Sequence, residues 1–221
     1  MKHYAIIVAG GSGTRMGSDI PKQFLLLQSK PILMHTLEKF HNSNAELILV
    51  LHTDYHDYWK NLCEEFSFKI PHLLVNGGNN RFESVKSGLK QIAQDSIIAV
   101  HDAVRPLVKV ESIRNAFIVA SEKGNAVLAV PSKDSLRRVV DGKNNTVVRS
   151  EYYLIQTPQV FWYSTLIKSY DIEFKEEFTD DASVVESMGE KINLVEGDYS
   201  NIKITTKEDL MIAETLMKIQ N

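Results

Sequence analysis

Short, uninterrupted runs of apolar residues recur along the chain, separated by segments with helical spacing. The runs lie at residues 5–8, 47–51, 73–75, 97–100 and 126–130. Because they do not alternate with polar residues, they fit strands that are covered on both faces, as in a parallel sheet. Apolar residues with a spacing near 3.6 indicate helices at residues 33–40, 82–92, 113–120 and 210–219. The pattern predicts an α/β fold with a mostly parallel, Rossmann-like twisted sheet and helices on both faces.

The alternation of strands and helices breaks between residues 131 and 159. Leu136–Val140 and Thr146–Arg149 mix charged and apolar residues, and turn-forming residues lie between them. This predicts a projecting β-hairpin arm within a single domain of residues 1–221. An isolated two-stranded ribbon is marginally stable in water, so we expect the arm to pack against a second copy in a homodimer. The alternative is a hairpin that folds back on its own domain.

The first predicted strand leads into a glycine-rich, basic loop. Glycines let backbone N–H groups approach phosphate oxygens, and cationic side chains add positive charge. Neither familiar glycine motif fits, because Thr14 follows Gly13 where a Walker loop has lysine, and Met16 replaces the third glycine of a dinucleotide fingerprint. The glycines alone would equally fit a plain turn between a strand and a helix. Arg15 and Lys22 favour a phosphate site, since a plain turn needs no cations.

Other chemistry-bearing residues follow the ends of later predicted strands, where ligands of open parallel sheets bind. Gly77 and Gly78, with Ser84 on the next helix, suit a base or ribose, although a simple turn fits as well. Asp102 is a candidate partner of Mg²⁺, and His101 fits a structural hydrogen-bonding role because the histidines show no zinc spacing. Arg105 would clamp a phosphate or bridge to a nearby carboxylate at the surface.

Two downstream segments carry further charge. Asp180 and Asp181 look like a metal or acid–base pair, but they fit better as the acidic first turn of a helix that Thr179 caps. Lys203 interrupts a predicted apolar strand, so its side chain would leave the sheet on the face opposite to Ile202 and Ile204. A solvated edge lysine is the alternative. Thr206 and Asp209 fit a capping box at the start of the last helix.

Composition and charge limit the cellular locations and the binding partners to be expected for this protein. The net charge of -3 gives no overall attraction to nucleic acid or to anionic membranes. No apolar run is long enough for a membrane span or a signal-peptide core, and the one cysteine, Cys63, forms no internal disulfide. We expect a cytoplasmic protein that binds neither nucleic acid nor membrane.

Several motifs in one order resemble those of the 2-C-methyl-D-erythritol 4-phosphate cytidylyltransferase family, which serves the non-mevalonate route to isoprenoids. The resemblance covers nearly the whole chain. The matching stretches are Ala9 to Met16, Pro21-Lys22-Gln23, Gly77-Gly78, Ser84-Val85, His101-Asp102-Ala103, Arg105-Pro106, Gln156-Thr157-Pro158-Gln159, Thr179 to Ser183 and Asn201-Ile202-Lys203.

The resemblance implies that CMP passes from CTP to the polyol phosphate, with Mg²⁺ or another divalent cation and with release of pyrophosphate. Arg15 and Lys22 would stabilise the α-phosphate, and Arg149 and Lys203 would position the substrate phosphate. The implied CTP-binding residues are Ala9, Gly10, Gly11, Gly13, Gly77, Gly78, Asn79, Ser84, Asp102 and Ala103. The implied polyol phosphate residues are Arg105, Ser135, Arg149, Thr157, Thr179 and Lys203, some of them supplied by the partner's arm.

Two positions depart from the family pattern. Asn79 stands where aspartate is usual, and Ser135 where threonine is usual, and both keep a hydrogen-bonding group. The runner-up is ribitol 5-phosphate cytidylyltransferase, a relative that shares the glycine-rich loop and the segment from His101 to Pro106. A non-catalytic nucleotide-binding module is the alternative from a different class, and it would have little reason to keep Arg15, Lys22 and Lys203 together.

Overall fold

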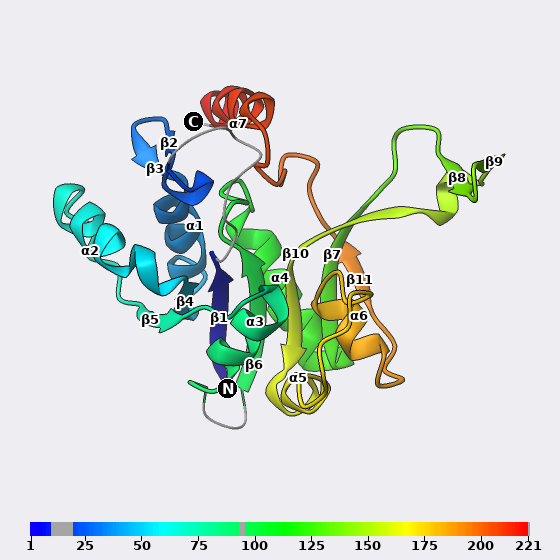
Figure 1. Cartoon of the computed structure of the whole chain (residues 1–221), viewed down its shortest axis with the longest axis horizontal. Helices are drawn as coiled ribbons and strands as arrows, with labels where there is room; N and C mark the ends of the chain where they lie inside the picture. The colour runs from blue at the N-terminus through cyan, green and yellow to red at the C-terminus, as the bar shows by residue number, and fades with distance from the viewer. Residues whose placement is uncertain (10–19, 93–95, 221) are drawn as a thin grey trace.

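A computed structural model of the chain describes residues 1–9, 20–92 and 96–220 (Figure 1). At its centre is a seven-stranded sheet with the order β11-β7-β10-β6-β1-β4-β5. Its strands are β1 (Lys2–Val8), β4 (Glu46–Leu51), β5 (Leu73–Asn76), β6 (Ser96–Asp102), β7 (Asn125–Pro131), β10 (Tyr153–Trp162) and β11 (Leu194–Glu196). β1 pairs in parallel with β4 and β6, β4 with β5, and β7 with β11. The predicted mostly parallel sheet is confirmed.

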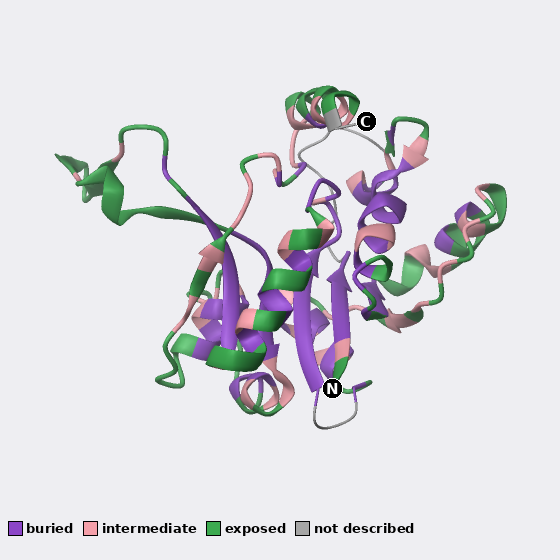
Figure 2. Ribbon diagram, turned by 180° about the vertical axis from the view of Figure 1, so that it is seen from behind, coloured by how far each residue is buried: buried purple, intermediate pink, exposed green. Residues whose placement is uncertain are grey.

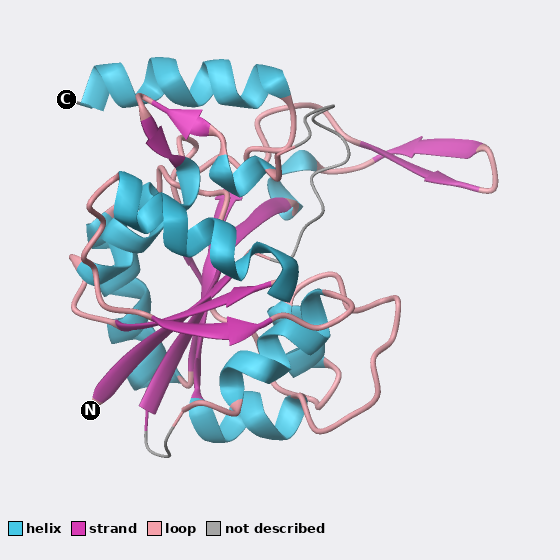
Figure 3. Cartoon of the chain, turned by 60° about the vertical axis from the view of Figure 1, so that its left-hand side comes forward, coloured by secondary structure: helices cyan, strands magenta, loops and turns pink. Residues whose placement is uncertain are grey.

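Helices cover both faces of the sheet, as Figure 3 shows. One face carries α1 (Ile32–His41), α2 (His56–Glu65) and α4 (Val110–Lys123); the other carries α3 (Arg81–Leu89), α5 (Tyr163–Ser169) and α6 (Asp181–Glu186). Successive strand residues point to opposite faces, so Ala5 and Ile7 of β1 join the first core while Tyr4 and Ile6 join the second. Two covered faces explain why β1, β4 and β6, at the centre of the sheet, are largely apolar and mostly buried, as Figure 2 shows.

A smaller apolar cluster lies beyond the carboxyl ends of the strands. Here the hairpin of β2 (Leu26–Leu27) and β3 (Lys30–Pro31) contacts α7 (Lys207–Gln220). The capping box predicted for α7 is confirmed, because the N–H of Asp209 donates to Thr206 Oγ1 at 3.2 Å and the N–H of Thr206 donates to Asp209 Oδ2 at 2.8 Å. None of the helices in the described ranges has the length and apolarity needed to cross a membrane.

The last part of the region assigned to the arm is instead a strand of the central sheet. β10 runs antiparallel between β6 and β7 and pairs with both. Its apolar pattern is interrupted by Gln156-Thr157-Pro158, and its register shifts between Ile155 and Gln159. This interruption is the reason that the apolar pattern did not reveal the strand.

The β-hairpin arm itself is confirmed and projects away from the sheet in Figure 1. It consists of β8 (Arg137–Val140) and β9 (Lys143–Thr146), and every residue of both strands is exposed. Asp141 and Gly142 form the turn with φ values of 49° and 74°, which suits a tight two-residue hairpin. The second strand was predicted too late in the sequence, because Arg149 belongs to the 3₁₀ turn η4 (Arg149–Glu151). The alternative of a hairpin folded back on its own domain is wrong.

Candidate active site

Segments that the sequence analysis singled out meet at the carboxyl edge of the parallel strands. The N–H groups of Ala9, Gly77 and Ala103 donate to carbonyl oxygens at neighbouring strand ends, at 2.8, 2.8 and 3.0 Å respectively. The segments that follow β1, β5 and β6 are therefore tied together at this edge. It is the edge at which open parallel sheets bind their ligands.

The predicted phosphate loop, with Gly10, Gly11, Gly13 and Arg15, lies outside the described residues. Immediately beyond it is the 3₁₀ turn η2 (Lys22–Phe24). The buried side chain of Gln23 donates to the carbonyl oxygen of Ala9 at 2.9 Å. This hydrogen bond holds the half-buried Lys22 close to the end of β1, a positioning role for Gln23 that residue type alone does not reveal.

The turn after β5 is tightly built around two glycines. A Cβ on Gly78 would lie 2.3 Å from Glu83 Cβ, so this position has no room for a side chain. Ser84 is buried; its hydroxyl accepts from the N–H of Gly78 at 3.1 Å and donates to the carbonyl oxygen of Asn80 at 2.8 Å. Ser84 therefore shapes the turn from within, while Asn79 is exposed on it.

Asp102, the last residue of β6, lies among three cations. Lys203 Nζ is 3.0 Å and Arg105 Nε is 3.4 Å from Oδ2, and Arg81 Nε is 3.5 Å from Oδ1. Burial alone would raise the pKa of the Asp102 carboxyl, but the three cations outweigh burial and hold this pKa well below its ordinary value. Asp102 is therefore a carboxylate at neutral pH, and both of its oxygens face positive charge.

This arrangement bears on the predicted metal role of Asp102. In the described ranges, histidine, cysteine, aspartate and glutamate form no group of three or more that could hold a metal ion. A divalent cation that binds Asp102 directly would have to displace Lys203 or Arg105 from Oδ2, or Arg81 from Oδ1. The described side chains therefore do not fit a protein-held Mg²⁺, whose ligands would have to come from substrate phosphates and water.

Beside Asp102 lies a cavity of about 200 Å³, which we call the Asp102 cavity. Four of the six residues predicted for the polyol phosphate line it, namely Arg105, Thr157, Thr179 and Lys203. The other two, Ser135 and Arg149, are exposed residues of the arm region and do not line it. A guanidinium N–H of Arg149 instead donates to the carbonyl oxygen of Lys133 at 2.8 Å.

A chain of hydrogen bonds fixes the floor of the Asp102 cavity. The backbone N–H of Asp102 donates to Thr157 Oγ1 at 3.1 Å, which leaves the threonine hydroxyl to donate to His101 Nδ1 at 2.9 Å. His101 Nε2 lies 3.2 Å from the carbonyl oxygen of Arg105 and therefore carries the ring proton. The structural role predicted for His101 is confirmed. Burial lowers its pKa to about 3, so the ring is neutral.

The segment around Lys203 differs from the prediction. Residues 201–205 form a loop rather than a strand. Ile204 is buried in the cluster beneath α7, whereas the side chain of Lys203 is 42% exposed and turns to Asp102. The carbonyl oxygen of Asn201 accepts from Arg105 at 2.8 Å, so this loop holds both cations on one side of the carboxylate.

The paired acids have separate roles. Asp180, and not Thr179, caps α6: its carboxylate accepts from the N–H of Ser183 at 2.9 Å in a capping box. Asp181 is fully buried and receives two bonds from Arg81, at 3.0 and 2.7 Å, and one from the Tyr170 hydroxyl at 2.6 Å. No local sequence pattern predicts this group, because Arg81 and Asp181 are 100 positions apart.

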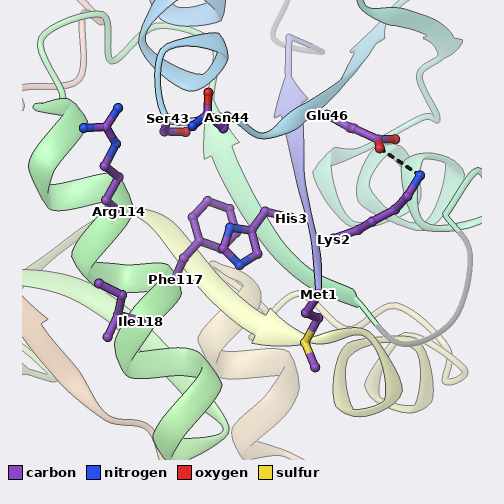
Figure 4. Close-up of a pocket in the computed structure, with 9 residues that line it drawn as sticks. All are labelled: Met1, Lys2, His3, Ser43, Asn44, Glu46, Arg114, Phe117 and Ile118. Carbon is purple, nitrogen blue, oxygen red and sulfur yellow. Dashed lines mark ion pairs between the residues drawn. The ribbon is translucent and has the colours of Figure 1, made fainter.

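A second cavity, of about 510 Å³, lies at the amino-terminal end of β1, away from the Asp102 cavity (Figure 4). Here the His3 ring stacks on Phe117 at 4.2 Å, and Lys2 and Glu46 form an ion pair at 2.9 Å. Arg114, on α4, donates to the carbonyl oxygen of Asn42 at 2.6 Å. The cavity is larger, but it lacks the buried, converging charges that surround Asp102.

Comparison with known proteins identifies the family of the chain. A family model described as "IspD: 2-C-methyl-D-erythritol 4-phosphate cytidylyltransferase" matches residues 3–219. The protein of that name from Bacteroides thetaiotaomicron is 49% identical over 219 residues, covering 98% of this chain and 100% of the relative. The protein of the same name from Azobacteroides pseudotrichonymphae is 50% identical over 219 residues, covering 97% of this chain and 98% of the relative.

Solved structures show the same similarity in three dimensions. The 4-diphosphocytidyl-2C-methyl-D-erythritol synthase of Anaerococcus prevotii superposes with a TM-score of 0.84 at 31% identity, covering 98% of each chain. The 2-C-methyl-D-erythritol 4-phosphate cytidylyltransferase of Francisella tularensis superposes with a TM-score of 0.81 at 32% identity, covering 97% of this chain and 99% of the other. The family model spans nearly the whole chain, the relatives share about half of its residues and the solved structures share its fold, so the chain belongs to the 2-C-methyl-D-erythritol 4-phosphate cytidylyltransferase family.

Proposed function

We propose that this protein transfers CMP from CTP to 2-C-methyl-D-erythritol 4-phosphate and releases pyrophosphate, as a step in the synthesis of isoprenoid precursors. The observation that carries the proposal is the Asp102 cavity, where Arg105 and Lys203 converge beside the strand ends that would hold the nucleotide. A phosphate entering this cavity would lie next to the edge from which the glycine-rich loop departs.

The reaction has to bring two anions together. The two substrates carry roughly five to six negative charges, and their repulsion in a partly dry site is on the order of several kcal/mol. We assign Arg15 and Lys22 to the α-phosphate, where negative charge accumulates in the transition state. Lys203 suits the acceptor phosphate, because its amino group is tethered by Asp102 at 3.0 Å and remains partly exposed.

The proposed chemistry is a direct displacement. An oxygen of the acceptor phosphate forms a bond to the α-phosphorus of CTP, and the bond from that phosphorus to the bridging oxygen of the β-phosphate breaks. The acceptor phosphate is already ionised, so neither a general base nor a covalent nucleophile is required. A Mg²⁺ ion bound to the triphosphate oxygens would supply further charge neutralisation.

We further propose that the enzyme is a homodimer whose arms complete each other's sites. Support comes from the exposed apolar side chains of the arm and of the neighbouring part of β10, including Val139 at 65%, Val148 at 59% and Leu154 at 52% exposure. A second chain would cover them. Ser135 and Arg149 would then reach the partner's acceptor phosphate. A cytoplasmic location is consistent with the use of a single cysteine.

Pyrophosphate release tests the proposal. CTP and Mg²⁺ are mixed with the protein and either 2-C-methyl-D-erythritol 4-phosphate, ribitol 5-phosphate or no acceptor. We expect rapid release only with the methylerythritol substrate. Faster release with ribitol 5-phosphate would reassign the acceptor, and CTP binding without release would indicate a non-catalytic nucleotide-binding module.

A further inference from the structure

The buried ion pair between α3 and α6 has no role in the reaction proposed above. Arg81 lies in the first turn of α3, and its two terminal nitrogens bond both oxygens of Asp181. Asp181 has no exposed surface, and the hydroxyl of Tyr170 donates to one of its oxygens at 2.6 Å. The guanidinium of Arg81 is therefore held in one place by a planar, two-point contact that a flexible surface arginine would lack.

Arg81 has a third contact, and it points toward the reaction. Its Nε lies 3.5 Å from Asp102 Oδ1, on the side of the carboxylate opposite to Lys203 and Arg105. Without this contact, the two cations at Oδ2, Lys203 and Arg105, would alone set the orientation of the carboxylate. With it, the carboxylate lies between a fixed charge and the two side chains that face the acceptor phosphate.

The burial of the side chains in this chain of contacts supports a positioning role for Arg81. The Asp181 side chain is fully buried, those of Asp102, Arg105 and Arg81 are 11%, 12% and 28% exposed, and that of Lys203 is 42% exposed. Burial would lower the pKa of the Arg81 guanidinium, but Asp181 and Asp102 raise it above its ordinary value. Its positive charge is therefore permanent. Of the charged groups around Asp102, Lys203 is thus the most exposed and the others are mostly buried, as expected where buried partners orient a group that binds substrate.

We propose that Arg81 is a positioning residue of this enzyme. Locked by Asp181 and Tyr170, it fixes the Asp102 carboxylate and thereby places Lys203 and Arg105 for the acceptor phosphate. The proposal rests on the proposed function, because the ligand of these cations is the polyol phosphate. Two other roles make different predictions: Arg81 could contact the phosphate directly, since it also lines the Asp102 cavity, or serve only to stabilise the fold.

The test compares three variants by steady-state kinetics for each substrate. Tyr170→Phe removes only the hydroxyl that is bonded to Asp181. Asp181 and Arg81 lie between this hydroxyl and Asp102 in the chain of contacts. Arg81→Lys keeps the charge but loses the two-point contact. Arg114→Lys is the matched control, since Arg114 lies on α4 at the second cavity, and it should leave the kinetics unchanged.

We expect Arg81→Lys to raise KM for methylerythritol phosphate about 10-fold, and Tyr170→Phe to raise it by a smaller factor. KM for CTP should change less than KM for the acceptor in both variants, because Lys203 and Arg105, the two cations that Asp102 holds, are assigned to the acceptor phosphate. A fall in thermal stability with unchanged KM values would overturn the proposal in favour of a purely structural role. If Arg81→Lys failed to fold, Tyr170→Phe would decide alone, with an unchanged KM for the acceptor overturning the proposal.

A double-mutant cycle separates positioning from direct contact. In an Asp102→Asn background, Arg81→Lys should add less than about 2-fold to the loss in kcat/KM, because the carboxylate that it positions is gone. A full, independent loss in that background would overturn the proposal and indicate direct contact. Absence of pyrophosphate release from wild type and from Arg114→Lys would instead refute the proposed function itself.

Discussion

Acidification should destabilise the fold through His101, the buried residue that precedes Asp102. Burial, the largest cause, lowers the pKa of His101 to about 3 from the ordinary value of 6.5. The negative charge of Asp102 and the hydrogen bond to the Arg105 carbonyl oxygen oppose this shift, and the positive charges of Arg105 and Arg81 add to it. As the pH falls below 6.5, the unfolded chain binds a proton at this ring and the folded chain does not. Stability is therefore lost progressively between pH 6.5 and about 3.

The size of this loss follows from the two pKa values. The His101 pKa is 6.5 in the unfolded chain and about 3 in the folded chain. By proton linkage, the free energy of unfolding therefore falls by about 2 kcal/mol between about pH 7 and pH 5. Asp102 does not interfere in this range. Its pKa lies below the ordinary value of 3.8, so the stability that it contributes is lost only at pH values below 3.8.

The measurement is urea unfolding of wild type and of His101→Gln at about pH 7, 6 and 5. Glutamine keeps hydrogen-bonding capacity without a titrating ring, so the variant should show the weaker pH dependence, whatever its absolute stability. His3 and His35, whose pKa values burial also lowers, contribute equally to both proteins and cancel in the difference. Parallel pH dependences for the two proteins would refute the reasoning, because they would mean that His101 is not buried as a neutral ring.

Three further predictions concern the reaction. Lys22→Ala should lower kcat about 10²-fold or more while leaving thermal unfolding unchanged, and an unchanged kcat would count against its assigned role at the α-phosphate. Gly78→Ala should raise KM for CTP about 10-fold but not KM for the acceptor, since a Cβ placed 2.3 Å from Glu83 Cβ forces the turn to move. Mixing inactive Lys22→Ala and Arg149→Ala subunits should restore part of the pyrophosphate release if the arms are exchanged, and no rescue would leave the shared site without support.

Local patterns in the sequence predict the framework of this fold well. The strands at the centre of the sheet bury both faces, so their apolar runs could be recognised, and parallel strands necessarily bring their carboxyl ends to one edge. That is why Asp102, Arg105 and the Gly77-Gly78 turn were correctly expected at strand ends. Lys203 was correctly selected for its charge. Its neighbours Ile202 and Ile204 were wrongly assigned to a strand, because apolar residues that are buried in a loop and in a strand can give the same local pattern.

Features that depend on distant partners were not predictable in this way. β10 carries Gln156-Thr157-Pro158 in its middle, and these residues are tolerated there because Asn201, Asp198 and His101 accept or donate their hydrogen bonds. The contact of Arg81 with Asp181 joins two helices across 100 positions. Neither arrangement leaves a periodic trace, since each is specified by tertiary contacts.

The continuity of β10 has a consequence for how family members can differ in length. One strand leaves the arm at Tyr153 and carries Gln156 and Thr157 into the middle of the sheet. An inserted residue at the Asp141–Gly142 tip would only lengthen a solvent-exposed loop. The same insertion after Ile155 would turn the following side chains to the opposite face and remove Thr157 from His101. We therefore expect family members to differ in length at the Asp141–Gly142 tip and to keep the same length in β10 after Ile155.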